Sequence, residues 1–482
     1  MKPPEHHSPS TTPPSSFARL WTDRLPASVD LAIVGGGFSG LLALIHTLRL
    51  RPNTRVAVIE QAPRRGPGPA YGACDAAHLL NVPASRMGAL PDDPGAFYTW
   101  LERRVPDAFS AGDFVARALY GEYLIDLLNE QVQGRRERVE FVQSTVTRID
   151  PRPDDVAIDT ADGSRCIAGA VILAVGIPPG PPPWSALPSA HDERAKSSAL
   201  VADPWLPNAL DGVPRDDAVL IIGSGLTAID VVVAIRERGH RGHITLVSRN
   251  GRLPLPHAAD GAAPVEVPTT TFSGGPRQVL RQLRKLARDR VEAGHPWQSV
   301  IDAIRPRTAT IWRSWSSAER RRFLRALRPF WEVHRHRAPT STLALLNHLT
   351  SCGQVTLVRG QLASVRAMDG GRIRVTLQSV RDDIAPLVVA RVFNCAGPPA
   401  SVHASTDPLI ERLLATGVAT SDCEELGLCA DDDGRLIGTS GVPNPRVVVI
   451  GSLRRGELWE SIAVPELRLQ ALRAAQVLAT IR

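Results

Sequence analysis

The sequence predicts an α/β protein with two Rossmann-like dinucleotide-binding domains, the second inserted into the first, and a mostly helical insertion. Two observations predict this fold class. An apolar strand followed by a glycine-rich turn and a helix occurs twice, after residue 34 and after residue 222. The chain of 482 residues is also too long for one hydrophobic core, because single domains rarely exceed 250 residues.

The first turn follows the apolar run 31–34, which is typical of a central strand covered on both faces. Gly35 allows the tight turn, Gly37 lets the backbone approach a pyrophosphate, and Gly40 lets the next helix pack closely on the strand. The helix N-terminus offers unpaired N–H groups and a partial positive charge to phosphates. Glu60 ends the following strand, where a carboxylate accepts hydrogen bonds from a ribose diol.

These features are in register, which favours a dinucleotide site over a turn without a ligand. An acid at this position indicates a cofactor with a free ribose diol, so we predict that the first site binds FAD. The residues predicted to bind it are Gly35, Gly37, Phe38, Ser39, Gly40, Glu60, Gln61, Asn81, Val146, Gly176 and Gly451.

The second turn follows the apolar run 219–222, with Ala228 in place of the third glycine. Its paired strand, 244–247, ends in Ser248 and Arg249 instead of an acid. An acid would repel a 2′-phosphate, whereas an arginine binds one through a planar fork of donors. This site is therefore predicted to prefer NADPH over NADH, through Gly223, Gly225, Leu226, Thr227, Ser248 and Arg249.

Two dinucleotide sites imply a hydride donor and an acceptor, with FAD in the first domain and NADPH in the inserted one. The predicted FAD-binding domain comprises residues 28–183 and 389–482. The predicted NAD(P)-binding domain comprises residues 184–388, with a helical insertion at 275–348. Residues 1–27 are rich in Pro, Ser and Thr and are predicted to be a disordered arm.

Composition favours a soluble cytoplasmic protein. Hydrophobic residues make up 43% of the chain, yet no uninterrupted apolar run reaches the length of a membrane span. The N-terminus lacks the apolar core of a signal peptide. Six scattered cysteines form no closely spaced pair, which argues against a disulfide framework and against a metal site. The oligomeric state is left open.

The net charge of +7 is concentrated in residues 276–337, where fifteen Arg and one Lys face five acids. Such a cluster can attract an anionic partner, or it can be the solvated face of a helical insertion. No nucleic-acid-binding signature accompanies it, so the solvated face is favoured and no nucleic-acid partner is predicted.

Pro- and Gly-rich residues 66–72, followed by 78–84, indicate an irregular, fixed loop near the ligand edge of the sheet. Asn81 in this loop carries a donor and an acceptor that suit the edge of a flavin ring, although it could equally cap a surface turn. An apolar strand, 446–451, leads through Glu457 into a final helix, 464–481.

Several motifs resemble a known family: the two glycine turns, HLLNVPA at 78–84 with Asp92-Asp93-Pro94, and the tail 456–466. Also similar are Leu327 to Trp331 and the HRHR run that ends at Arg337. The family comprises bacterial FAD/NAD(P)-binding proteins that share the FAD domain of an FAD-dependent urate hydroxylase. This resemblance implies a two-domain flavoprotein related to flavin monooxygenases and N-hydroxylases. The chain departs from many such flavoproteins at Gly451-Ser452, where they have Gly-Asp.

The predicted function is an FAD-dependent, NADPH-using oxidoreductase, a monooxygenase that acts with molecular oxygen on a small polar metabolite. Without a thiol pair for disulfide chemistry, reduced flavin would pass its electrons to oxygen or to another acceptor. The alternatives are a flavin reductase or dehydrogenase with another acceptor, and a non-catalytic FAD/NAD(P)-binding sensor. The catalytic candidates are Asn81, His334, Arg337 and Glu457. His334 and Arg337, three residues apart on a helix, could reach one ligand together, or the helix end could simply be solvated.

Overall fold

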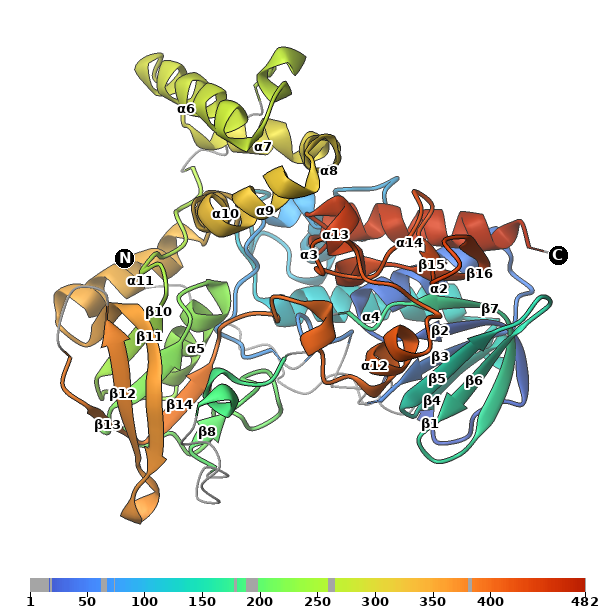
Figure 1. Ribbon diagram of the computed structural model, residues 1–482, viewed down its shortest axis with the longest axis horizontal. Helices are drawn as coiled ribbons and strands as arrows, with labels where there is room; N and C mark the ends of the chain where they lie inside the picture. Colours follow the sequence, from blue (N-terminus) through green and yellow to red (C-terminus); the bar gives the residue numbers. More distant parts are fainter. Residues whose placement is uncertain are drawn as a thin grey trace. The chain divides into compact units, whose positions relative to one another are not determined.

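The computed structural model describes residues 17, 20–61, 67–72, 74–176, 180–187, 198–258, 265–379 and 384–481. The chain divides into two compact units, Met1–Pro178 with Ala400–Arg482, and Pro179–Pro399 (Figure 1). A second unit inserted into a first one confirms the predicted architecture.

The first unit is built on a sheet in the order β1-β4-β3-β2-β7-β16-β15, extended on β7 by β6 and then β5. Strands β4, β3, β2, β7 and β16 are parallel. The apolar residues at their centres are buried, as their sequences predict. The bounds are β1 Trp21–Thr22, β2 Ser28–Val34, β3 Val56–Glu60, β4 Val139–Gln143, β5 Val146–Pro151, β6 Val156–Thr160, β7 Arg165–Leu173, β15 Arg435–Ile437 and β16 Pro443–Val449.

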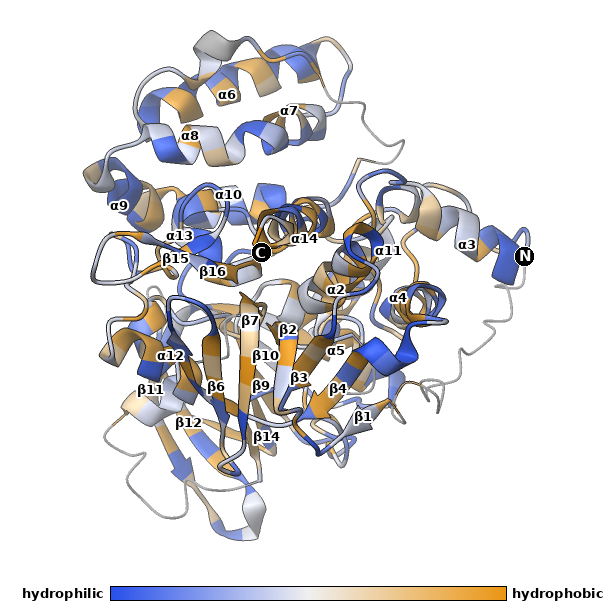
Figure 2. Ribbon diagram, turned by 90° about the vertical axis from the view of Figure 1, so that its right-hand side faces the viewer, coloured by the Kyte–Doolittle hydropathy of each residue, from blue (hydrophilic) through white to orange (hydrophobic). Residues whose placement is uncertain are grey.

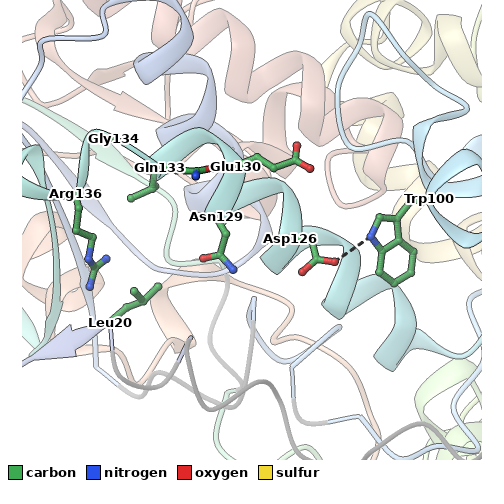
Figure 3. Close-up of a pocket in the computed structure, with 9 residues that line it drawn as sticks. Leu20, Trp100, Asp126, Asn129, Glu130, Gln133, Gly134 and Arg136 are labelled. Carbon is green, nitrogen blue, oxygen red and sulfur yellow. Dashed lines mark hydrogen bonds between the residues drawn. The ribbon is translucent and has the colours of Figure 1, made fainter. Parts of the chain in front are cut away.

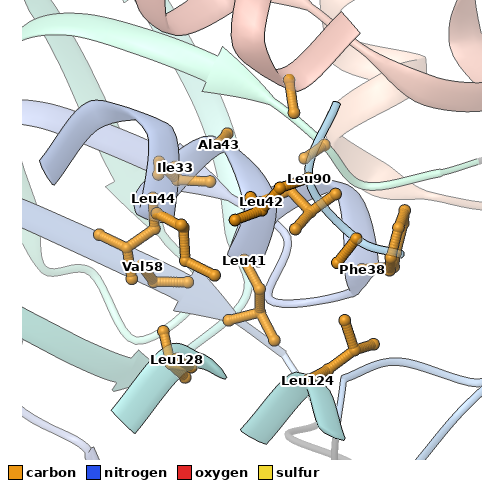
Figure 4. Close-up of a cluster of buried hydrophobic side chains, with 14 of the residues drawn as sticks. Ile33, Phe38, Leu41, Leu42, Ala43, Leu44, Val58, Leu90, Leu124 and Leu128 are labelled. Carbon is orange, nitrogen blue, oxygen red and sulfur yellow. The ribbon is translucent and has the colours of Figure 1, made fainter. Parts of the chain in front are cut away.

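Helix α2 lies at the centre of this unit's core. Its leucines, among them Leu41 and Leu44, face Val58 of β3 and Leu124 and Leu128 of α4 (Figure 4). Fully burying a leucine side chain stabilises a fold by about 1.5–3 kcal/mol. The buried leucines therefore fix the position of α2 and of the glycine turn that precedes it. The helices are α2 Phe38–Leu50, α3 Ala96–Arg104, α4 Arg117–Val132, α12 Pro408–Ala415, α13 Arg455–Leu458 and α14 Val464–Ala479.

The N-terminal arm is partly ordered, so the prediction of disorder for residues 1–27 is wrong for its last part. Strand β1 pairs in parallel with β4, placing Trp21 opposite Phe141. The Phe17 side chain is buried, and the Trp21 ring packs edge-on against Phe141 at 5.3 Å. Aromatic burial therefore outweighs the disorder-promoting composition of the arm. Residues 1–16, 18 and 19 lie outside the described residues.

The second unit has a sheet in the order β13-β12-β11-β10-β9-β14-β8. Its strands are β8 Leu200–Val201, β9 Val219–Ile222, β10 Ile244–Ser248, β11 Val355–Ala367, β12 Ile373–Ser379, β13 Leu387–Val389 and β14 Arg391–Asn394. Strands β8, β14, β9, β10 and β11 are parallel, and β11 to β13 are antiparallel. Helices α5 Leu226–Glu237 and α11 Thr340–Ser351 contribute to its core.

Two predicted boundaries are corrected. Strand β14 lies between β9 and β8 of the second sheet, so the chain returns to the first unit at Ala400 and not at 389. Helix α11 buries Leu343, Leu346 and Leu349 in the core of the second unit, so the helical insertion ends before this helix and not at 348. An apolar strand that ends in glycine suits either sheet, and only the pairing of β14 with β9 distinguishes them.

The insertion is helical, as predicted, with α6 Pro276–Glu292, α7 Gln298–Ile304, α8 Thr308–Ser314, α9 Ser317–Ala326 and α10 Arg328–Arg335. A capping box between Ser316 and Glu319 starts α9. Figure 2 shows hydrophilic residues along α6 and α9. The solvated-face interpretation of the basic cluster is confirmed for α6, whose Arg277, Arg281, Arg284, Lys285 and Arg288 are exposed. Within the described ranges, no helix is both long and apolar enough to cross a membrane.

We expect the protein to lose stability in acid because of His46 on α2. Its side chain is 3% exposed, and burial, with a contribution from Arg49, lowers its pKa to about 4. Because the folded-state pKa lies below the unfolded value, the unfolded chain binds the proton first as the pH falls from 6.5 to 4. We expect this histidine to remove about 3 kcal/mol of unfolding free energy by pH 4.

Urea unfolding at pH 7 and pH 4.5 measures this effect. His46→Gln should show a shallower pH dependence than the wild type, and replacement of the exposed His403 by Gln should not. Equal pH dependence in the wild type and His46→Gln would contradict the assignment.

Candidate functional site

The first glycine turn, between β2 and α2, has the predicted conformation. Gly35 has a φ of +107°, and a Cβ there would lie 2.6 Å from the carbonyl oxygen of Ala174. A Cβ on Gly40 would lie 1.9 Å from the carbonyl oxygen of Gly35, so helix and turn approach too closely for any side chain. The conformational roles predicted for these two glycines are therefore confirmed.

Gly37 differs from both, because a Cβ there would make only ordinary van der Waals contact. It precedes the first turn of α2 with a φ of −74°, and the nearest atom to its Cβ position is the Cα of Gly68, 3.8 Å away. Neither backbone strain nor a clash requires glycine here. A phosphate that came close to the N–H groups at the start of α2 would require it, so the residues present fit a pyrophosphate.

The Glu60 carboxylate lies beside the same turn. Its Oε2 accepts a hydrogen bond from the Gly36 N–H at 2.9 Å. Since a carboxylate can accept several hydrogen bonds, this group at the end of β3 suits the ribose of a dinucleotide. Gln61 is exposed next to it, and residues 62–66 lie outside the described part of the chain.

The structure brings the segment around Gly451 to the start of α2, and the segment around Gly176 to Ser452 beside it. A Cβ on Gly451, whose φ is +83°, would lie 3.5 Å from the Ser39 Oγ. A Cβ on Gly176, whose φ is +73°, would lie 3.8 Å from the Ser452 Oγ. The Gly451 N–H donates to the Gln470 Oε1 at 2.9 Å. The role of this buried glutamine could not be predicted from the sequence, because only the fold brings α14 to this loop.

Two other predicted FAD contacts lie in the same unit. The side chain of Val146 is buried among β-strand residues, so only its backbone could contact a nucleotide. Asn81 is half-buried in the predicted irregular loop, which is anchored by hydrogen bonds from Leu80 N to the Val115 oxygen and from Ala84 N to the Asp113 oxygen. Contact between Asn81 and a flavin stays a prediction.

The loop that begins at residue 67 covers the glycine turn. A Cβ on Gly68 would lie 3.0 Å from the Gly37 Cα. Tyr71 packs edge-on against Phe38 with 5.7 Å between ring centroids, and against Tyr120 at 4.7 Å. Burial raises the pKa of Tyr71 to about 12, so its phenol stays neutral and supports Phe38 as an apolar wall. No sequence pattern distinguishes Tyr71 from the other residues of this loop.

The second turn, between β9 and α5, likewise has one glycine that the backbone requires and one that it does not. Gly223 has a φ of +120°, and a Cβ there would lie 2.1 Å from the carbonyl oxygen of Cys395. Gly225 starts α5 at a φ of −83°, and no atom lies within 4 Å of its Cβ position. Leu226 and Thr227 follow it, partly exposed in the first helical turn. This open helix N-terminus also fits a pyrophosphate.

Ser248 and Arg249 have separate roles at the end of β10. The Ser248 Oγ accepts from the Ser224 Oγ at 2.8 Å and from the Gly251 N–H at 3.1 Å, so it ties the turn together. Arg249 is exposed and makes no hydrogen bond or ion pair with the residues that the structure describes. Its guanidinium is thus available to an anionic group.

The two glycines of the second turn give a matched pair of substitutions. Gly225→Ala should fold normally, because the backbone is ordinary and the space is empty, yet bind NADPH more weakly. Gly223→Ala should lose about 3 kcal/mol or more of stability, because it combines positive φ with a clash against backbone. Thermal unfolding and NADPH titration of both variants measure this. A destabilised Gly225→Ala would contradict the open-space argument.

His334 and Arg337 do not share a helix face, so the helical spacing predicted for them is wrong, while their joint contact with a ligand stays a prediction. Helix α10 ends at Arg335, and His336 leaves it with a φ of −94° and a ψ of 72°. The buried Arg337 is ion-paired with Asp302 of α7. The His334 Nδ1 lies 2.7 Å from the Phe330 oxygen, and its ring packs edge-on against Trp297 at 5.0 Å. These contacts tie α10 to α7.

Glu457 also has structural partners. Its Oε1 accepts from the Ala430 N–H at 2.6 Å, and its Oε2 accepts from the Arg454 Nη2 at 3.1 Å. The Arg454 guanidinium is buried and also donates to the Asp431 oxygen at 2.9 Å. This network holds the loop before α14, which gives Glu457 a positioning role in that loop.

A surface hollow of about 530 Å³ lies at the C-terminal end of α4 (Figure 3). It contains the hydrogen bond from the Trp100 Nε1 to the Asp126 Oδ2, at 3.0 Å. None of the predicted site residues lines it. Leu20, Trp100, Asp126, Asn129, Glu130, Val132, Gln133, Gly134 and Arg136 do. The glycine turns, and not this hollow, are therefore the candidate site.

A comparison with known protein families finds a match in the segment that contains the first glycine turn. Residues 32–178 match a family described as FAD-NAD(P)-binding. This segment contains the first glycine turn, Glu60 and the loop around Asn81. No protein with curated information matches the sequence.

Solved structures share the fold over nearly the whole chain. The ornithine N-hydroxylase of Kutzneria sp. 744, with reduced FAD, NADP+ and L-ornithine, is 15% identical, with 94% of this chain and 99% of that chain covered and a TM-score of 0.64. The FAD-bound cadaverine monooxygenase of Erwinia amylovora is 13% identical, with 95% of each chain covered and a TM-score of 0.58. The thioredoxin reductase of Lactococcus lactis is 13% identical, with 94% and 98% covered and a TM-score of 0.52. The two-domain flavoprotein fold is thereby confirmed.

Proposed function

We propose that the protein is an FAD-dependent, NADPH-using monooxygenase, because residues 32–178 match a family described as FAD-NAD(P)-binding and the whole chain has a two-domain flavoprotein fold. Its substrate class is a small polar metabolite that receives one oxygen atom from molecular oxygen. The ornithine and cadaverine named for two similar structures are metabolites of this class.

One observation carries the cofactor proposal. Each unit has a helix that starts beside a glycine that neither backbone strain nor a clash requires, Gly37 in the first and Gly225 in the second. Each turn is followed by a different group at the end of the paired strand, Glu60 in one and Arg249 in the other. A carboxylate suits a ribose diol, and an arginine suits a 2′-phosphate. The first unit would therefore hold FAD and the second NADPH.

The protein's own contribution is binding and orientation. The start of α2, with Ser39 and Gly451 beside it, would hold the FAD pyrophosphate, and Glu60 would orient the ribose. Arg249 would select the phosphorylated nicotinamide cofactor. Bound FAD would supply the redox chemistry, taking two electrons from NADPH and passing them to oxygen.

A flavin reductase or dehydrogenase is the second candidate. A thioredoxin reductase has the same fold, which favours this class. Against disulfide chemistry, burial raises the pKa of Cys166 to about 11 and also raises that of Cys395, so neither thiol is activated.

Anaerobic mixing of the FAD-loaded protein with NADPH or NADH, followed by oxygen, tests the proposal. The monooxygenase is expected to bleach with NADPH faster than with NADH. Its oxygen uptake should then yield hydroxylated product from a panel of small amines and other polar metabolites. Turnover with an artificial electron acceptor, without any hydroxylated product, would favour the reductase. Bleaching by neither nucleotide would refute both enzymes and favour the sensor.

A further inference from the structure

Trp21 lies against the first glycine turn. A Cβ on Gly36 would lie 2.7 Å from the Trp21 Cη2 and 3.2 Å from its Cζ2. The same point lies 3.2 Å from the Glu60 Cβ. The Glu60 carboxylate in turn accepts the Gly36 N–H at 2.9 Å. The indole, the glycine backbone and the acid thus form one packed group at the end of β3.

Strand pairing and ring packing fix this indole in place. β1 pairs in parallel with β4, with Trp21 opposite Phe141. The Trp21 ring packs edge-on against Phe141 at 5.3 Å and against Phe17 at 6.1 Å. An indole held on two sides is pre-ordered, so a ligand that contacts it does not have to immobilise it.

The indole N–H of Trp21 is buried and donates to no acceptor in the described residues. Other tryptophans do find acceptors: Trp100 donates to Asp126 at 3.0 Å, and Trp315 donates to the Gly274 oxygen at 3.2 Å. A buried N–H without an acceptor is unfavourable and rare in native proteins. An acceptor oxygen from a bound molecule would satisfy it.

We propose that Trp21 belongs to the first dinucleotide site and recognises the ADP half of the cofactor. Its N–H donates to a ribose or phosphate oxygen beside Glu60, and its ring closes the Gly36 side of the site. The ADP half is indicated because the acid at the end of β3 is the group that meets the adenosine ribose in this fold. This inference rests on the proposed FAD site and adds a selectivity for FAD over FMN.

Trp21→Phe tests it, because phenylalanine keeps an aromatic ring and removes only the N–H donor. Titration of the full-length apoprotein should show roughly tenfold weaker binding of FAD and of ADP, the loss of about one hydrogen bond. Binding of FMN, which lacks the ADP half, should not change. Trp100→Phe is the matched control, since its N–H already has Asp126, and it should bind all three ligands normally.

Thermal unfolding of the apoproteins separates recognition from folding. Removing an unpaired buried donor should leave the stability of Trp21→Phe unchanged or raised, while its stabilisation by added FAD falls. Wild-type affinity of Trp21→Phe for FAD and ADP would overturn the proposal, as would equal losses for ADP and FMN. If the wild-type protein itself binds no FAD, the proposed function fails instead.

Discussion

Replacement of Arg249 by alanine is expected to raise the KM for NADPH roughly 10- to 100-fold and to change the KM for NADH little. A hydrogen bond to a charged group contributes about 1.5–3 kcal/mol, and only NADPH carries the 2′-phosphate that would make it. Arg249 is exposed at the end of β10 and makes no ion pair with the described residues, so its loss should not disturb the fold.

Steady-state or single-turnover reduction of FAD with each nucleotide measures this selectivity. Arg241→Ala, which removes an equally exposed arginine from the same unit, controls for the change in net charge. Salt should weaken NADPH binding more in the wild type than in Arg249→Ala, because the phosphate contact is ionic. An equal rise in KM for both nucleotides would refute the assignment of Arg249.

Replacement of Arg337 by alanine is expected to lower the unfolding free energy of the helical insertion by about 3–5 kcal/mol. The substitution leaves the largely buried Asp302 carboxylate without its ionic partner. The ion pair joins α7 to the chain that leaves α10. Its loss should loosen this contact before it affects the β-sheet of the same unit.

Hydrogen exchange of α7 and α10, with thermal unfolding, measures the effect. The double variant Arg337→Leu with Asp302→Leu should recover most of the loss, since two apolar side chains leave no buried charge. Arg321→Ala, on the exposed side of α9, is the control. If the double variant were as unstable as Arg337→Ala, the unpaired charge would not be the cause.

The sequence alone determined the strand-turn-helix units and their glycine chemistry. The conformational roles of Gly35 and Gly223 could be predicted, because a positive φ and a close backbone approach are local requirements that few other residues meet. The contrast between Glu60 and Arg249 is equally local, because Glu60 ends the strand after its turn and Arg249 directly follows the end of the corresponding strand. The two-domain fold follows from the repetition of these local patterns.

A motif does not reveal the partners of the catalytic candidates. Helical spacing suggested that His334 and Arg337 act together, yet α10 ends between them and Asp302 binds the arginine. Glu457 likewise has its carboxylate engaged by Ala430 and Arg454. A side chain that is already paired holds structure together, and its pairing is visible only in three dimensions.

Tertiary structure alone decided where distant segments meet. Strand β14 joins the second sheet and not the first, and the composition of residues 1–27 concealed the strand that carries Trp21 to Gly36. Neither fact is encoded in neighbouring residues. Sheet pairing and aromatic burial are non-local, so they depend on surfaces that exist only after the rest of the unit has folded.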